Sequence, residues 1–168
     1  MSEKASAPGG LALVEALVNT VDLDSGTDRL DTAEGRARFG IAEAEQELAA
    51  ARDLRESLRA VCLAHAGHPP HRAVTPLDEL LAAAPLLVTV SAADGSAALS
   101  PAHPAPLASR VAAAIAEALV EGTWPRLKAC EAPTCHWAYY DRSPAGRRRW
   151  CSMSVCGARA KMRRYRAK

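Results

Sequence analysis

Aromatic residues are scarce in this 168-residue sequence, and they are unevenly placed. The chain has one phenylalanine, three tryptophans and three tyrosines, and Phe39 is the one aromatic residue before position 124. Alanine supplies much of the remaining apolar composition, with 37 residues. Because alanine buries little area and favours helix, the sequence predicts thin helical packing over most of its length.

Long apolar runs and the common catalytic motifs are also missing. No segment approaches the ~18 consecutive apolar residues of a membrane-spanning helix. The polar start MSEKASAPGG lacks the basic-then-apolar order of a secretory signal. No phosphate loop, dinucleotide fingerprint or nucleophile elbow is present. We therefore expect a cytoplasmic protein that contacts no membrane and is not an enzyme.

Charge divides the chain at residue 123. Residues 1–123 hold 9 Lys/Arg and 17 Asp/Glu, a net charge of −8, whereas residues 124–168 hold 12 Lys/Arg and 2 Asp/Glu, a net charge of +10. The second segment also contains four of the five cysteines and every tryptophan and tyrosine. We therefore predict two domains, an acidic one over 1–123 and a basic one over 124–168.

Hydrophobic periodicity predicts that the first domain is mainly α-helical with a small β-hairpin, an α+β fold. Four helices are expected, over residues 11–21, 41–66, 75–84 and 107–122. The helix over 41–66 is the clearest amphipathic segment, with Cys62 in its apolar stripe, and charged residues such as Arg55 and Arg59 are expected to lie mostly off that stripe.

Capping and turn residues set the expected ends of these elements. Thr32 is expected to cap a short turn, and Thr75 is expected to cap the third helix. Strands 86–90 and 97–99 are expected to pair across a tight Asp94–Gly95 turn. The polar run 22–31 predicts a loop.

The C-terminal cysteines form two C-x4-C pairs separated by fifteen residues, Cys130 and Cys135 followed by Cys151 and Cys156. Four thiolates suit the tetrahedral geometry of zinc, and a closed shell leaves no position for catalysis. We predict a structural Zn²⁺ site, which would also stabilise a domain of 45 residues that is too small for a large core. An iron–sulfur centre or thiol redox chemistry would use the same ligands.

Basic residues surround this cysteine cluster and predict contact with a polyanion, because phosphate is the natural complement of such charge. The candidate nucleic-acid-binding residues are Arg147, Arg148, Arg149, Arg159, Lys161, Arg163, Arg164, Arg166 and Lys168. Arg159 and Arg163 lie one helical turn apart and could reach guanine in a major groove. The alternative is that some of these arginines only neutralise the thiolates or form a solvated helix face.

We expect other residues of the segment 124–168, called the finger below, to have structural roles. Three aromatic residues are expected to form its miniature core: Trp137, Tyr139 and Trp150. His136 is expected outside the ligand shell, with its replacing Cys135 as a zinc ligand as the less favoured alternative, and Asp141 is expected to pair with Arg142 or to cap a turn. In the first domain, we expect His65, His68 and His71 to form a polar helix end and loop, with a second metal site as the less favoured alternative.

The finger sequence resembles the CGNR zinc-finger family. The resemblance covers about residues 127–168 and rests on Tyr139–Ser143, Arg148–Met153 and Cys156–Lys161. In this family an ABATE domain usually precedes the finger. Weaker similarity to that domain is found at Leu11–Leu13 and Leu17–Thr20. The resemblance implies a bacterial, stress-responsive transcription regulator whose finger binds DNA. Ala158 stands where the family name has asparagine, so no contact of that amide is transferred.

These observations together predict a helical N-terminal domain that senses an effector or dimerises, followed by a small treble-clef-like zinc finger that binds DNA through a basic helix. A protein-interaction module is the alternative, in which the basic finger docks an acidic partner or the acidic N-terminal domain. The charges of −8 and +10 in the two segments support that alternative. A thiol-redox switch is the third class considered.

Overall fold

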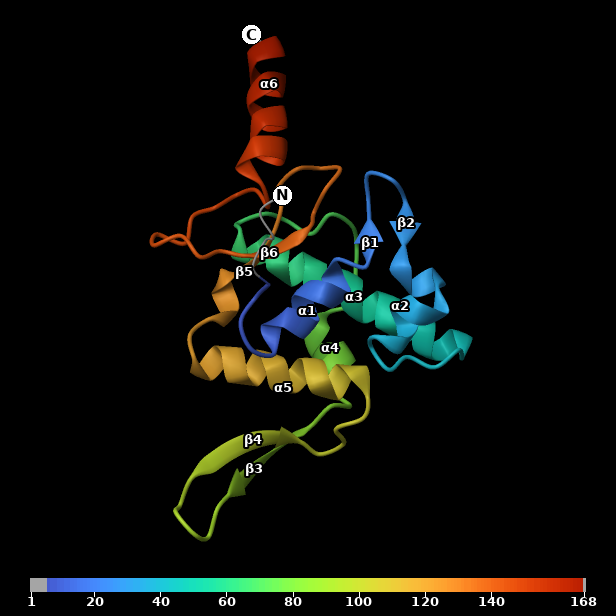
Figure 1. The fold of residues 1–168 in the computed structure, drawn as a ribbon, viewed down its shortest axis with the longest axis vertical. Coiled ribbons are helices and arrows are strands. Elements are labelled where there is room, and N and C mark those ends of the chain that lie inside the picture. Colours follow the sequence, from blue (N-terminus) through green and yellow to red (C-terminus); the bar gives the residue numbers. More distant parts are fainter. Residues whose placement is uncertain (1–5, 168) are drawn as a thin grey trace.

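Three helices form the centre of the molecule in the computed structural model, which describes residues 6–167 (Figure 1). They are α1 (Leu11–Val18), α3 (Glu45–His65) and α5 (Leu107–Val120). Each turns an apolar stripe inward, as the side chains of Val14, Leu58 and Val111 illustrate by their complete burial. The helices predicted over 11–21, 41–66 and 107–122 are therefore confirmed, with slightly different ends.

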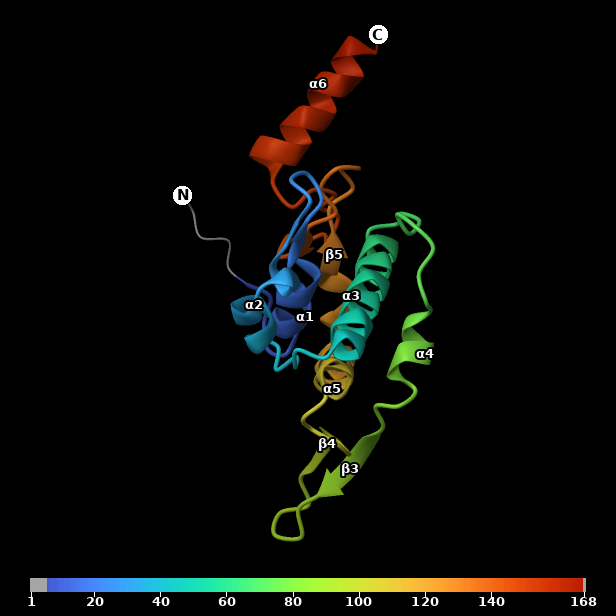
Figure 2. The ribbon, with the colours of Figure 1, turned by 90° about the vertical axis from the view of Figure 1, so that its right-hand side faces the viewer.

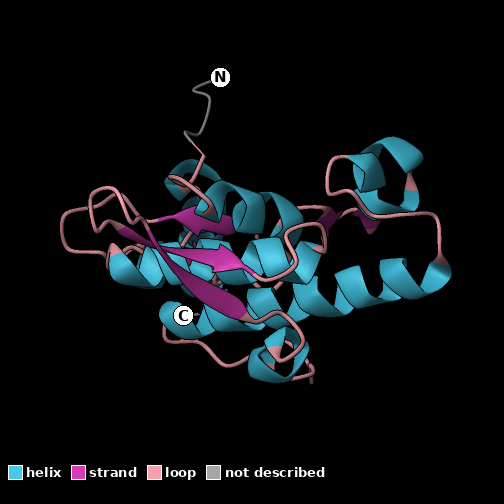
Figure 3. Cartoon of the chain, turned by 90° about the horizontal axis from the view of Figure 1, so that it is seen from below, coloured by secondary structure: helices cyan, strands magenta, loops and turns pink. Residues whose placement is uncertain are grey.

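Shorter elements surround these helices, and Figure 3 shows that helices make up more of the fold than strands. The short helices are α2 (Ala33–Ala37), α4 (Leu77–Leu81), the 3-10 helices η1 (Arg29–Asp31) and η2 (Trp124–Arg126), the π-helical turn η3 (Met153–Gly157) and the C-terminal α6 (Ala158–Arg166). The strands are β1 (Val21–Asp22), β2 (Thr27–Asp28), β3 (Leu86–Val90), β4 (Ala97–Pro101), β5 (Leu127–Ala129) and β6 (Ala138–Tyr140).

The six strands form three antiparallel pairs, β1–β2, β3–β4 and β5–β6. The predicted hairpin is confirmed, with Val88 opposite Leu99, and it projects beyond α5 (Figure 1). The expected loop over 22–31 is wrong in part, since β1 and β2 pair there around a turn. The Asp22 carboxylate accepts hydrogen bonds from two backbone N–H groups of that turn, and Gly26 adopts a φ of 72°.

The two predicted caps differ in outcome. Thr32 caps α2, because its hydroxyl accepts a hydrogen bond from the Gly35 N–H at 3.0 Å. The cap predicted at Thr75 is wrong: α4 begins after Pro76, and no side chain caps it. Among the described residues, we find no helix that combines the length and the apolar character needed to cross a membrane.

One hydrophobic core crosses the predicted boundary at residue 123. It joins the inward faces of α1, α3 and α5 to Trp124, Leu127, Ala129 and Ala138, which lie on η2, β5 and β6. Figure 2 shows β5 beside α3. The finger therefore rests on the helical domain through apolar contacts, while the division into two domains remains a prediction.

Candidate metal centre and basic surface

The four C-terminal cysteines converge, although they come from separate segments. Cys130 follows β5, Cys135 lies in the next turn, Cys151 precedes η3 and Cys156 lies within it. Their four Sγ atoms all lie within 4.8 Å of one another, with separations of 3.7 Å for Cys135–Cys151 and 3.8 Å for Cys151–Cys156. A tetrahedron with metal–sulfur distances of about 2.3 Å has edges of about 3.8 Å, so the cluster fits zinc. A disulfide would require two Sγ atoms about 2.05 Å apart.

The protonation of these thiols also favours a cation. Hydrogen bonds from the Cys135 and Cys151 thiols hold the pKa of Cys130 well below its ordinary value. The same contacts with Cys130 and Cys151, together with burial, raise the pKa of Cys135. Cys130 and Cys135 therefore do not ionise together without a counter-charge, which a divalent ion would supply.

A small core of aromatic residues packs against the cysteine cluster, as predicted. Tyr139 is buried within it, and its hydroxyl donates a hydrogen bond to the Arg148 carbonyl at 2.7 Å. Trp137 and Trp150 are partly buried against the same cluster. The cysteines and these rings together form a second core, separate from the main core.

Asp141 anchors the loop that precedes Cys151. Its carboxylate is completely buried and accepts hydrogen bonds from the Ser143 N–H, the Ser143 hydroxyl and the Arg148 N–H. Lys128 Nζ lies 3.1 Å from Asp141 Oδ2. Burial alone would raise the pKa of Asp141, but these contacts outweigh it and lower the pKa. The predicted turn cap is confirmed, whereas the predicted partner is wrong, because Lys128 pairs with Asp141 and Arg142 does not.

The histidines take structural positions. His136 Nδ1 lies 2.9 Å from the Cys130 carbonyl oxygen, outside the sulfur cluster. In the helical domain, His65 Nδ1 lies 2.8 Å from the Leu127 carbonyl oxygen, while His68 and His71 face carboxylates. Within residues 6–167, the four cysteines are the one group with metal-binding geometry.

A buried polar network in α3 contacts the finger, and no sequence pattern predicts it. Arg55 and Arg59 were expected off the apolar stripe, but both are buried, and Glu56 lies between them within hydrogen-bonding distance of each. Burial would raise the pKa of Glu56, but Arg59 and Arg55 outweigh it and lower the pKa. An Arg-Glu-x-x-Arg pattern is equally typical of solvated helix faces, so the correction comes from tertiary packing.

The predicted basic residues divide into two groups. Lys161, Arg163, Arg164 and Arg166 are exposed on α6, which extends away from the rest of the molecule (Figures 1 and 2). Arg147 is also exposed in the loop before Cys151. These cations therefore present their charge outward.

The other cations of the set have partners within the molecule. Arg148 donates a hydrogen bond to the Cys151 carbonyl, and Arg149 forms an ion pair with Glu131. Arg159 Nη1 lies 3.7 Å from an Asp24 carboxylate oxygen in the β1–β2 turn. Lys168 lies outside the described residues. The predicted contacts of all nine cations with nucleic acid remain predictions.

The helical core, the tetrahedral cysteine cluster and the projecting basic helix define a zinc-finger protein. Residues 11–122 match the ABATE family, described as "Putative stress-induced transcription regulator", and the chain belongs to this family. Residues 126–168 match the CGNR zinc finger. The resemblance stated from the sequence is thus confirmed, and the cysteines form a structural zinc site. No curated protein matches the chain.

Proposed function

We propose that the protein is a cytoplasmic transcription regulator whose zinc finger binds DNA and performs no catalysis. The observation that carries this proposal is the position of α6. All five of its cations are exposed, and beyond the contact of Arg159 with Asp24 the helix extends away from the rest of the molecule (Figure 1). A duplex carries one negative charge per ~1.7 Å of axis, so a basic helix of this kind gains affinity by releasing counterions.

Zinc has a supporting role in this proposal. When bound, it would hold the segments around Cys135 and Cys151 together, and α6 begins at Ala158, two residues after Cys156. The direction of the basic helix therefore depends on the cysteine cluster. Arg159 and Arg163 are both exposed on α6, one helical turn apart, and are our candidates for contact with base edges. Arg147 and the remaining α6 cations are candidates for contact with phosphate.

The second candidate is a module that docks an acidic protein or its own N-terminal domain. The ion pair between Arg159 and Asp24 favours this candidate, because it joins α6 to the acidic domain. Both side chains are more than half exposed, however, and such pairs contribute only about 0–1 kcal/mol. A DNA phosphate would therefore displace Asp24 at little cost.

A competition experiment separates these candidates. Binding of the zinc-loaded chain to a labelled duplex is measured by fluorescence anisotropy, with unlabelled duplex and polyglutamate as competitors at equal total charge. We expect the duplex to compete at least about tenfold more effectively, since counterion release from DNA and fixed phosphate spacing both favour it. Equal competition by polyglutamate would favour an acidic protein partner.

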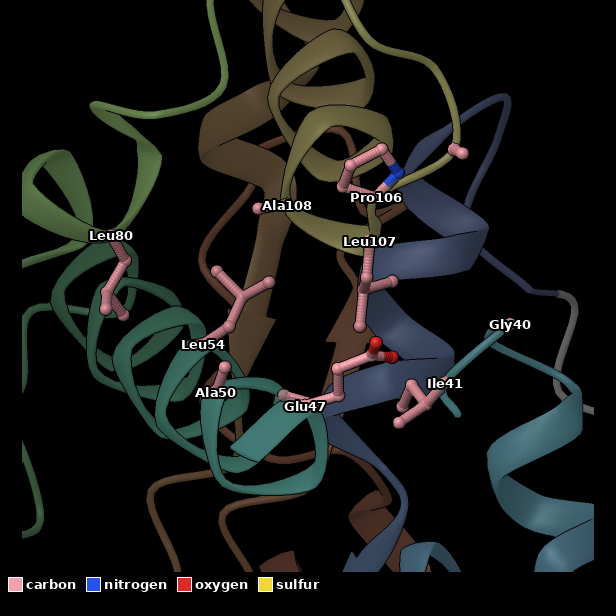
Figure 4. Close-up of a pocket in the computed structure, with 11 residues that line it drawn as sticks. Gly40, Ile41, Glu47, Ala50, Leu54, Leu80, Pro106, Leu107 and Ala108 are labelled. Carbon is pink, nitrogen blue, oxygen red and sulfur yellow. The ribbon is translucent and has the colours of Figure 1, made fainter. Parts of the chain in front are cut away.

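For the N-terminal domain we propose effector sensing through a half-open apolar cavity of about 490 Å³. Figure 4 shows Leu54, Leu80 and Leu107 around it, with the Glu47 carboxylate among them. An apolar lining with one carboxylate suits a small apolar molecule that carries positive charge. Thermal-shift screening with hydrophobic amines tests this, because a ligand raises the melting temperature only by binding the folded state. Glu47→Gln should abolish the shift.

Dimerisation through the β3–β4 hairpin is the other proposed role of this domain. Val88 and Leu99 are opposite each other on one face, and both are largely exposed. The hairpin carries one charged residue, Asp94 in its turn, so its strand edges lack the charges that usually prevent pairing. Sedimentation equilibrium should give a dimer that Val88→Lys dissociates. A wild-type monomer at all concentrations would contradict dimerisation.

A further inference from the structure

The segment that follows the second zinc ligand has an unusual backbone. His136, directly after Cys135, has a φ of 44°, and it is the one non-glycine residue with positive φ among residues 6–167. A residue with a Cβ atom adopts this region at a cost in free energy, so surrounding contacts must hold it there. The contacts that do so come from the finger, where the His136 N–H donates to the Ala132 carbonyl at 3.3 Å, and from the helical domain.

Arg59 of α3 provides the first contact. Its side chain is 0% exposed, and its Nη1 donates a hydrogen bond to the His136 carbonyl at 2.7 Å. The same guanidinium donates through Nη2 to the Val18 carbonyl at 2.7 Å and through Nε to Glu56 at 3.1 Å. The planar donor fork therefore ties the end of α1 and the body of α3 to the residue beside Cys135.

Asn19, at the end of α1, provides the second contact. Its Nδ2 donates to the Ala138 carbonyl at 3.0 Å, and its Oδ1 accepts from the Ala138 N–H at 2.7 Å. This pairing satisfies both backbone groups of Ala138, three residues after Cys135. Asn19 is itself buried, so the two hydrogen bonds are shielded from water.

Contacts within the finger also hold residues 136–138 in place. The Cys130 N–H donates to the Trp137 carbonyl at 3.0 Å, and His136 Nδ1 lies 2.9 Å from the Cys130 carbonyl oxygen. Residues 136–138 are thus held by the first cysteine on one side and by the helical domain on the other. Metal-binding turns commonly depend on such outer contacts to orient their ligands.

We propose that Arg59 and Asn19 are positioning residues of the zinc centre, so that the helical domain helps to set the rate at which the finger releases its metal. Neither residue touches the cysteine sulfurs; both act through the backbone of residues 136–138. The proposal holds whether the finger binds DNA or an acidic protein, because it concerns the metal site alone.

Zinc release to an excess of a chromogenic chelator tests the proposal on the full-length zinc-loaded chain. Asn19→Ala is the main variant, since it removes both hydrogen bonds without leaving a buried charge. Val111→Ala is the matched control, because Val111 is completely buried in α5 and belongs to the main core, not to the core formed around the cysteines. Temperatures are chosen so that both variants are compared at the same interval below their melting temperatures.

We expect Asn19→Ala to release zinc about 10–100-fold faster than wild type, the usual effect of losing an outer contact of a metal site. Val111→Ala should release zinc within about twofold of wild type. Equal release by Asn19→Ala and Val111→Ala would overturn the proposal, since both would then act only through general stability.

Arg59→Lys is the second variant, because lysine keeps the charge beside Glu56 but lacks the planar fork whose separate nitrogens reach Glu56, Val18 and His136. The spectrum of the cobalt-loaded protein gives a readout that does not depend on unfolding. A shift of the cobalt ligand-field bands in Asn19→Ala or Arg59→Lys, with no shift in Val111→Ala, is expected. Identical spectra in all variants would contradict a positioning role.

Discussion

The arginines of α3 and those of α6 make the most informative comparison in this molecule. Arg55 and Arg59 are buried, and each is satisfied by carboxylates or backbone carbonyls. Arg163 and Arg164 are exposed on a helix that extends from the molecule (Figure 2). The same side chain therefore stabilises the junction with the finger in one helix and remains available to a partner in the other.

Net charge alone hides this difference. The two kinds of arginine differ in burial. Loss of a buried arginine leaves a carboxylate without its counter-charge, whereas loss of an exposed arginine removes only a surface cation. The first kind should affect stability, and the second should affect binding.

The largest effect is expected from loss of a zinc ligand. Cys151→Ser should unfold the finger, because structural zinc in finger peptides contributes ~10–16 kcal/mol of apparent binding free energy. Metal content and near-UV circular dichroism report this directly, since all three tryptophans lie in the C-terminal 45 residues. Cys62→Ser is the control: burial raises the pKa of the Cys62 thiol to about 12, and this residue belongs to the main core. Loss of zinc from Cys62→Ser as well would contradict the assignment.

The next effect concerns the buried arginines. Arg59→Gln should lower the free energy of unfolding by about 3–5 kcal/mol, because Glu56 would lose one of its two buried cationic partners and the His136 and Val18 carbonyls would lose a charged donor. Arg52→Gln, in the same helix, should cost about 0–1 kcal/mol, since Arg52 forms its ion pairs at the surface. Urea unfolding followed by far-UV circular dichroism measures both. Similar losses in the two variants would remove the distinction between buried and exposed arginines.

A smaller effect is expected from pH at the junction of the two regions. Burial lowers the pKa of His65 below the ordinary value of 6.5, with Lys128 acting in the same direction. The neutral form is therefore favoured in the fold, so its contribution to stability is complete above about pH 6.5 and is lost as pH falls through the folded pKa. We expect the melting temperature of the wild type to fall more than that of His65→Gln between pH 7.5 and 5.5, in excess zinc. Parallel curves would show that His65 makes no such contribution.

The sequence was sufficient to predict those features that depend on local pattern. The apolar stripes of α1, α3 and α5 follow helical spacing, and the paired C-x4-C spacing identified all four cysteines that converge. The β3–β4 hairpin was predicted from β-branched residues around an Asp94–Gly95 turn. These features depend on contacts between residues close in the chain, which a single sequence records.

Other features depend on contacts between distant segments. Arg59 is separated from His136 by 77 residues and Asn19 is separated from Ala138 by 119, and neither pairing has a local signature. Lys128 was not expected as the partner of Asp141, because the β5–β6 pairing brings it there. The β1–β2 pair was missed because a polar run carries no alternation, and the Asp22 side chain stabilises its turn.

The salt dependence of DNA binding tests the central claim most directly. The logarithm of the binding constant is measured against the logarithm of salt concentration for the wild type, for Arg163→Gln/Arg164→Gln, and for Arg52→Gln as control. We predict that the double variant binds more weakly and that its slope is shallower by about 2, with zinc content and melting temperature unchanged, while Arg52→Gln matches the wild type. An unchanged slope in the double variant would contradict binding of DNA phosphates by α6.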